Sequence, residues 1–159
     1  MVGMTLLDDF VSKDRGRILH ATWEVFHTRD PEVLAPLAKQ LRRIDRATDD
    51  IDLGGALASN AQHVGHAIDR LRLFADGECL CAAYADHLFY EPSKEESYGY
   101  VRIVEEIPVF TDKGFPDRPT RVCECTDCGR VFDVQEGEYH YPWWKWTPRG
   151  KRPRTKARR

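Results

Sequence analysis

The spacing of the cysteines constrains this chain more than any other feature. Residues 125–129 read Cys-Thr-Asp-Cys-Gly, and the two-residue gap lets a tight turn aim both sulfurs at one ion. The following residue, Gly129, tolerates the left-handed conformation that closes such a turn. A second close pair lies upstream, and four thiolates in two pairs predict a tetrahedral site for Zn²⁺. The predicted ligands are Cys79, Cys81, Cys125 and Cys128.

The fifth cysteine, Cys123, has two interpretations. In an extended strand it points to the same face as the cysteine two residues further on, so it is a substitute for one of the four ligands. The other interpretation makes it a small buried residue at the end of a strand. His87 and His140 are further substitutes if a cysteine is excluded. A bridge between Cys79 and Cys81 is disfavoured, because disulfides across a C-x-C spacing are strained.

The composition and the N-terminus predict a globular protein of the cytoplasm. Hydrophobic residues make up 42% of the chain and charged residues 31%, and no apolar run approaches the roughly 20 residues that span a membrane. Residues 1–9 lack the basic start and the apolar stretch of a signal peptide. The five cysteines cannot all pair within one chain, so reduced thiols and metal binding are favoured over a disulfide framework.

Hydrophobic periodicity predicts about three amphipathic helices in residues 1–76. Asp30 followed by Pro31 is a good start for the second helix, and Pro36 predicts either a kink or a later start. Gly77 is placed to cap the end of the third helix. The apolar faces consist of Ile18, Thr22, Val25 and Phe26 in the first helix, Leu34, Leu37, Leu41 and Ile44 in the second, and Leu57, Ala61, Val64, Ile68 and Leu71 in the third.

Two histidines in the third predicted helix are a weaker metal candidate. His63 and His66 are three residues apart, so they share a helical face. No glutamate is placed to complete an H-E-x-x-H motif around them. The sequence therefore favours solvent-facing or capping histidines over a metal clamp.

Residues 77–148 change to a pattern that is typical of short β-strands. The predicted strands cover residues 79–84, 98–104, 120–125, 131–134 and 139–146, with a polar turn at 91–97, a loop at 111–119 and a turn at Glu136 and Gly137. The predicted fold class is therefore α+β, with an N-terminal helical part packed on a small C-terminal antiparallel sheet. A basic tail over residues 149–159, predicted to be disordered, completes the chain.

Residues 77–146 resemble a zinc ribbon. The resemblance rests on the C-x-x-C-G motif at 125–129, on the following strand with Phe132 and Val134, and on the upstream cysteine pair. It implies that two knuckles hold one structural Zn²⁺ in front of a small antiparallel sheet, with the motif as the second knuckle. The upstream pair departs from the family, because its spacing is C-x-C and 43 residues separate it from the motif, where about 15–20 are usual. The resemblance implies a metal but no particular activity.

Two features near the C-terminus are candidates for binding a partner. The aromatic residues of segment 139–146 either cover a small core or remain exposed as anchors for a protein or a nucleic acid. The tail has seven basic residues and no acidic one, whereas the rest of the chain has 17 basic against 26 acidic residues. The candidate binding residues are Tyr139, Tyr141, Trp143, Trp144 and Trp146 in the aromatic segment, and Arg152, Arg154 and Arg158 in the tail.

The sequence favours a non-catalytic protein over an enzyme. It has no P-loop, no dinucleotide-binding glycine motif and no nucleophile elbow, and zinc with four thiolates has no open position for a water. The predicted function is a zinc-stabilised binding or adaptor protein that recognises another protein and not a membrane. Two alternatives stay open: a nucleic-acid-binding protein that uses the tail and the aromatic strand, and a metalloenzyme whose open zinc site has three cysteines and a water.

Overall fold

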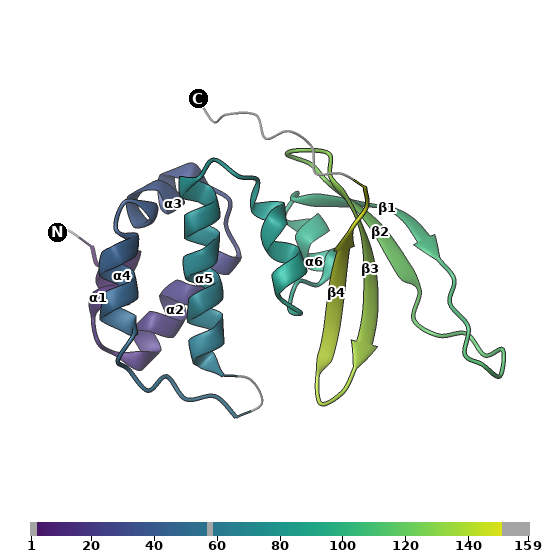
Figure 1. The fold of residues 1–159 in the computed structure, drawn as a ribbon, viewed down its shortest axis with the longest axis horizontal. Coiled ribbons are helices and arrows are strands. Elements are labelled where there is room, and N and C mark those ends of the chain that lie inside the picture. The colour runs from purple at the N-terminus through teal and green to yellow at the C-terminus, as the bar shows by residue number, and fades with distance from the viewer. Residues whose placement is uncertain (1–2, 57–58, 151–159) are drawn as a thin grey trace. The chain divides into compact units, whose positions relative to one another are not determined.

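The computed structural model describes residues 3–56 and 59–150, and the chain divides into two compact units, Met1–Leu80 and Cys81–Arg159 (Figure 1). The first unit is helical, and the second contains a four-stranded antiparallel sheet, so the predicted α+β class is confirmed. Leu57 of the third predicted helix and the tail residues Arg152, Arg154 and Arg158 lie outside the described residues. None of the helices in the described ranges is both long enough and apolar enough to cross a membrane.

The described part of the first unit has five α-helices, where the sequence predicted about three. One helix that the prediction missed begins after Thr5, whose side-chain oxygen accepts a hydrogen bond from the backbone N–H of Asp8 at 3.1 Å. The Asp8 carboxylate accepts the backbone N–H of Thr5 in return at 2.9 Å, which completes a capping box. The helices are α1 (Leu6–Val11), α2 (Arg15–Phe26), α3 (Pro31–Ala38), α4 (Leu41–Thr48) and α5 (Asn60–Ala75).

The second predicted helix is in fact two helices. It begins at Pro31 behind the Asp30 cap, as expected, but Pro36 lies inside α3 and the break follows at Lys39 and Gln40. Proline has no N–H to donate, so the last turns of α3 hold one hydrogen bond fewer than an unbroken helix. The chain leaves the helix through a tighter turn, in which the N–H of Gln40 donates to the carbonyl of Leu37 at 2.9 Å.

Arg70 of α5 is buried in the first unit and caps the end of α2. Its Nε atom donates to the carbonyl oxygen of Val25 at 3.1 Å, and its Nη2 atom donates to that of Thr28 at 2.9 Å. A cation beside the carbonyl end of a helix is favourable, because the last carbonyls of a helix have no partner within it. The sequence did not mark this residue, since its partners lie more than 40 residues away.

The expectation that His63 and His66 face the solvent or cap a helix is wrong. Their exposed fractions are 5% and 6%, and their rings lie against Trp23 and Phe26, with centroids 5.3 Å apart for Trp23 and His63 and 5.2 Å apart for Phe26 and His66. The reason is that α5 packs against α2, α3 and α4, so it is buried over more than one stripe. Periodicity alone identifies one apolar face and could not show that the neighbouring face is also covered.

In the second unit the sheet is a meander with the strand order β1-β2-β3-β4. Two expected elements differ: the predicted strand at 79–84 is replaced by a 3₁₀-helix that covers residues 80–86, and the predicted polar turn at 91–97 contains a helix. The last strand begins three residues later than predicted. The elements are η1 (Leu80–Asp86), α6 (Pro92–Ser97), β1 (Val101–Ile107), β2 (Thr120–Cys125), β3 (Val131–Glu138) and β4 (Pro142–Pro148).

Trp146 belongs to the core of the second unit. It is 2% exposed, its ring stacks on Tyr84 of η1 with centroids 4.2 Å apart, and Phe132 of β3 meets it edge-on. Its indole N–H donates to the carbonyl of Tyr90 at 2.8 Å. Tyr84 in turn donates its hydroxyl to the buried carboxylate of Glu95 at 2.7 Å, so each of these buried polar groups has a partner.

The predicted turn at Glu136 and Gly137 is also wrong, because β3 continues through both residues to Glu138. Gly137 pairs with Trp143 of β4, and a Cβ atom added at Gly137 would overlap the indole ring. The glycine is therefore needed for the close approach of a ring across the strands, and the chain turns after Glu138 instead.

Gly137→Ala is expected to destabilise the protein, because the new methyl group forces Trp143 out of its place; overpacking of this kind costs about 1–3 kcal/mol. Gly65→Ala in α5 is the matched control, since no atom lies within 4 Å of its added Cβ, and it should be neutral or stabilising by up to about 1 kcal/mol. Urea unfolding of the two variants and the parent measures both effects. Equal stability of all three proteins would contradict the packing described for Trp143.

Burial lowers the pKa of His63 below its usual value of 6.5. The folded state therefore holds His63 neutral at a pH where the unfolded chain begins to bind a proton. Its contribution to stability is complete above about pH 6.5 and is lost as the pH falls through that value towards the lower folded pKa. We expect the free energy of unfolding of the full chain to fall more steeply between pH 7.5 and 5.5 than that of His63→Phe. A slope that is unchanged in His63→Phe, and equal to that of the surface control His140→Gln, would contradict this assignment.

Candidate metal centre

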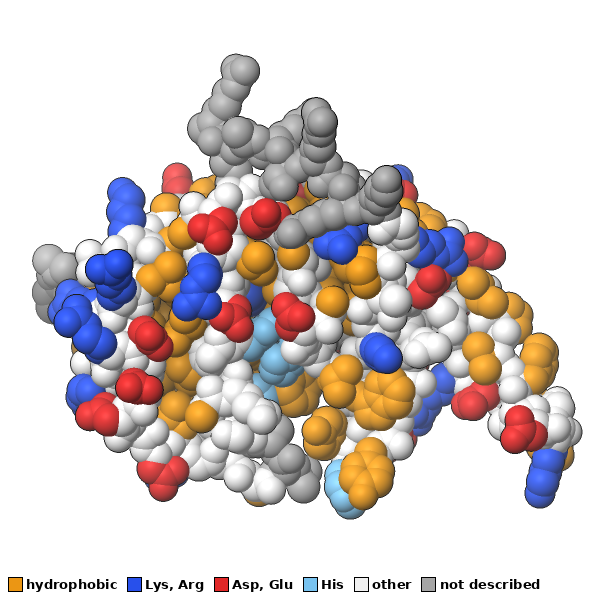
Figure 2. Space-filling model, in the orientation of Figure 1, with side chains coloured by type: hydrophobic (Ala, Val, Ile, Leu, Met, Phe, Trp, Pro, Cys, Tyr) orange, Lys and Arg blue, Asp and Glu red, His pale blue; other side chains and the backbone are white. Residues whose placement is uncertain are grey.

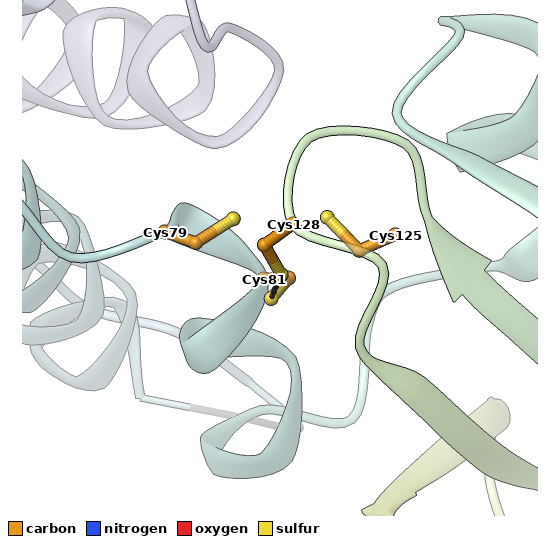
Figure 3. A group of neighbouring side chains, drawn as sticks. All are labelled: Cys79, Cys81, Cys125 and Cys128. Atoms are coloured by element: carbon orange, nitrogen blue, oxygen red, sulfur yellow. Dashed lines mark hydrogen bonds between the residues drawn. The ribbon is translucent and has the colours of Figure 1, made fainter. Parts of the chain in front are cut away.

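Four of the five cysteines converge on one point (Figure 3). The Sγ atoms of Cys79, Cys81, Cys125 and Cys128 all lie within 4.8 Å of one another, and those of Cys81 and Cys128 are 3.5 Å apart. None of the five cysteines, all of which lie in the described part of the chain, forms a disulfide. Within the described residues this is the one group of three or more His, Cys, Asp or Glu side chains that is placed to hold a metal ion.

Backbone hydrogen bonds shape the C-x-x-C turn. The N–H of Gly129 donates to the carbonyl of Cys125 at 2.9 Å, and the N–H of Cys125 donates to the carbonyl of Arg130 at 2.8 Å. Gly129 has a φ of 77°, the left-handed conformation that the sequence predicted for it. The backbone hydrogen bonds therefore define the conformation of the turn, and a residue with a Cβ atom at position 129 would be strained.

Thr126 fastens this turn to the segment that leads into β1. Its hydroxyl donates to the carbonyl of Gly99 at 2.7 Å, and its backbone N–H donates to that of Tyr100 at 3.0 Å. These bonds fix the first half of the turn, so the two sulfurs do not depend on the metal alone for their direction. No sequence signal marked Thr126, because its partners lie more than 25 residues upstream.

The upstream pair is positioned by the end of α5 and the start of η1. Gly77 has a φ of 71°, and the N–H of Glu78 donates to the carbonyl of Leu73 at 2.9 Å, so the helix ends in the glycine cap that the sequence predicted. Leu80, between the two cysteines, is buried in the hydrophobic core of the first unit. The buried Leu80 therefore anchors the backbone between Cys79 and Cys81, which gives this C-x-C segment a defined conformation.

The geometry of the sulfurs fits a tetrahedral ion. A metal with metal–sulfur bonds of about 2.3 Å places its four sulfurs roughly 3.8 Å apart. The observed separations are at most 4.8 Å, so small side-chain rotations are enough to reach that arrangement. The four ligands come from two segments, and all four are sulfur. The cluster can therefore hold one metal ion without a further ligand.

Cys123 lies outside this group of four. It pairs with Phe132 of β3 across the sheet and is completely buried. Burial raises the pKa of its thiol to about 12, so it stays protonated at neutral pH. The structure thus places Cys123 as a packed apolar residue, and neither of the substitute histidines, His87 and His140, joins the cluster.

The predicted aromatic binding residues occupy different environments. Tyr139 is 81% exposed at the turn between β3 and β4, whereas Trp146 is in the core. Trp143 and Trp144 are half-buried, and the ring of Tyr141 lies 5.9 Å from that of Phe89. Trp144 and Trp146 share one face of the strand, since they occupy alternate positions of β4.

Neither family models, nor curated proteins, nor solved structures gave a match to this chain. The four-cysteine cluster and the antiparallel sheet are compatible with the zinc-ribbon resemblance, but they identify no family. The site must therefore be interpreted from its own chemistry.

Replacing one cysteine at a time separates the ligands from the packed thiol. We expect the parent to bind one metal ion per chain, Cys123→Ala to keep it, and Cys128→Ala to lose it, because three sulfurs no longer close a tetrahedron. Elemental analysis of protein purified without chelator, together with native thiol titration, measures this. Metal loss from Cys123→Ala with correct folding would show that the ligand set is wrong, as would a metal-free parent whose thiols all react.

Proposed function

We propose that this chain is a non-catalytic protein that is stabilised by one Zn²⁺ and recognises another protein. The observation that carries the proposal is the cluster of four cysteine sulfurs within 4.8 Å of one another. Zinc that is bound by four thiolates has no open position for a water or a substrate, so such an ion is structural. Zinc is favoured because a tetrahedral set of thiolates suits it and because it needs no redox partner.

The proposed zinc stabilises the fold by joining two distant segments. Cys81 and Cys128 are 47 positions apart in the sequence, and the chain between them includes α6, β1 and β2. The free energy of metal binding then adds to the free energy of folding, since the unfolded chain does not hold four thiolates together. This support matters for a sheet of four short strands, whose core is small.

Ion pairs across the sheet favour a protein partner over a nucleic acid. Arg102 pairs with Glu124 at 3.3 Å, and Arg149, the first residue of the predicted tail, pairs with Asp133 at 2.7 Å. The remaining sheet pairs join Arg121 to Glu106 at 3.2 Å and to Glu136 at 3.1 Å, and Arg118 to Glu138 at 2.7 Å. Phosphates would have to displace these carboxylates, so the paired arginines do not form a basic surface for a nucleic-acid backbone.

Exposed apolar side chains in ordered segments also favour a protein partner. Val104, Phe110 and Phe115 are each more than half exposed although they lie in or beside the β1–β2 hairpin. Single exposed apolar residues are common, but several in one segment are typical of a surface that a partner covers.

Affinity capture with the zinc-loaded full chain tests this function. We expect the chain to retain a protein that is kept after nuclease treatment and lost when a chelator removes the metal, because binding then needs the zinc-stabilised fold. Cys128→Ala is the matched bait without metal. A partner that nuclease releases would favour the nucleic-acid alternative, and retention by Cys128→Ala at the same level as by the parent would contradict the role of the zinc.

A further inference from the structure

We propose that the loop of the β1–β2 hairpin docks into an apolar cleft, rimmed by basic side chains, on the partner protein. The residues that enter the cleft are Val109, Phe110 and Phe115, called here the aromatic tip. This inference rests on the proposed protein-binding function, and it names the surface that carries it and the chemistry of the partner.

The aromatic tip has no role in the core of the second unit. Phe110 is 61% exposed and Phe115 is 65% exposed, whereas the rings that form the core, such as Phe132 and Trp146, are almost completely buried. The loop extends away from β3 and β4 (Figure 1), and hydrophobic side chains reach the surface over this hairpin, at the right of the view in Figure 2. Two phenylalanines that the fold does not bury are a liability unless something else covers them.

The backbone of the loop is ordered although its rings are exposed. The N–H of Thr111 donates to the carbonyl of Phe115 at 2.8 Å, and the N–H of Asp117 donates to that of Val109 at 2.8 Å. Phe110 and Pro116 form a β-bridge, and Gly114 closes the end of the loop with a φ of 81°. A loop that is already in a defined conformation loses little backbone entropy on binding, which favours a docking role.

Two features at the base of the hairpin influence its orientation relative to the sheet. The register of β1 and β2 shifts between Ile103 and Glu105, where β1 has one extra residue; such a β-bulge bends the strand and increases its local twist. Arg118 in the loop pairs with Glu138 at the end of β3 at 2.7 Å. Both features favour one direction for the aromatic tip relative to the sheet.

The charges around the aromatic tip indicate the chemistry of the partner. Residues 105–118 contain four acidic and two basic side chains. Glu106 pairs with Arg121 and Arg118 pairs with Glu138, so three acidic side chains and one basic side chain are left to set the charge around the tip. An acidic surround attracts a basic rim, and it is repelled by the anionic surface of a phospholipid membrane. A protein cleft with Lys or Arg at its edge therefore fits better than a lipid surface.

A second copy of the chain fits this loop poorly. Two hairpin loops with the same acidic surround repel each other, so they do not complement one another. Strand addition is hindered as well, because the edge N–H of Ile103 donates to Glu96 at 2.7 Å and that of Trp144 donates to Leu88 at 3.0 Å.

Photo-crosslinking from within the aromatic tip tests the proposal. Two variants of the full zinc-loaded chain are compared. One has p-benzoylphenylalanine in place of Phe110, and the control has it in place of Tyr98, an exposed aromatic residue outside the hairpin loop. We expect an adduct with one partner protein from position 110 and not from position 98. With that partner purified, Phe110→Ser and Phe115→Ser should each weaken binding at least about tenfold, Tyr98→Ser should not, and added salt should weaken binding.

Several outcomes would overturn this inference. The first is an adduct from position 110 that contains a second copy of the chain or a lipid. The last is a partner that binds the Phe110→Ser, Phe115→Ser double variant as tightly as it binds the parent. In the last case the protein-binding function stands and only its surface is wrong. If neither crosslinking nor affinity capture yields a protein, the proposed function fails together with this inference. Unchanged zinc content and melting temperature of the serine variants confirm that they are folded.

Discussion

The convergence of four cysteine sulfurs is the constraint on which the second unit depends. It joins the start of η1 to the turn after β2, and every element from η1 to β2 lies on the chain between these points. The turn is prepared for this task before a metal arrives, because Gly129 and the hydrogen bonds of Thr126 already aim the C-x-x-C sulfurs. The hydrophobic contribution comes from the stack of Tyr84 on Trp146, which ties η1 to β4. The small sheet thus has a compact aromatic core, and the proposed metal adds a second support through the four sulfurs.

The loop of the β1–β2 hairpin contributes to neither the cysteine cluster nor the aromatic core. The strands of the hairpin pair with the sheet at their base, and an ion pair and a bulge favour one direction for its loop, but Phe110 and Phe115 add nothing to the core. The ordered backbone of this loop is what distinguishes it from an ordinary surface connection. The proposed function uses the same division: the metal holds the sheet, and the sheet holds the loop that contacts a partner.

Local signals predicted part of this structure well. The cysteine pairs, the caps at Asp30 and Gly77 and the left-handed Gly129 depend on residues close together in the sequence, and the structure contains each of them. The failures at Gly137 and His63 have a common cause in long-range packing. Gly137 was predicted in a turn because nothing nearby in the sequence shows that Trp143 lies over it. His63 is buried because α5 packs against three other helices. The hairpin loop was predicted as a loop, but only the structure showed that its phenylalanines stay outside.

X-ray absorption at the zinc edge of the purified full chain tests the central claim most directly, because it reports which atoms bind the ion and at what distance. The account predicts zinc with four sulfur neighbours at about 2.3 Å and no oxygen or nitrogen neighbour. Three sulfurs with one oxygen neighbour would contradict it, since such a zinc has an open position and the metalloenzyme alternative would then be favoured.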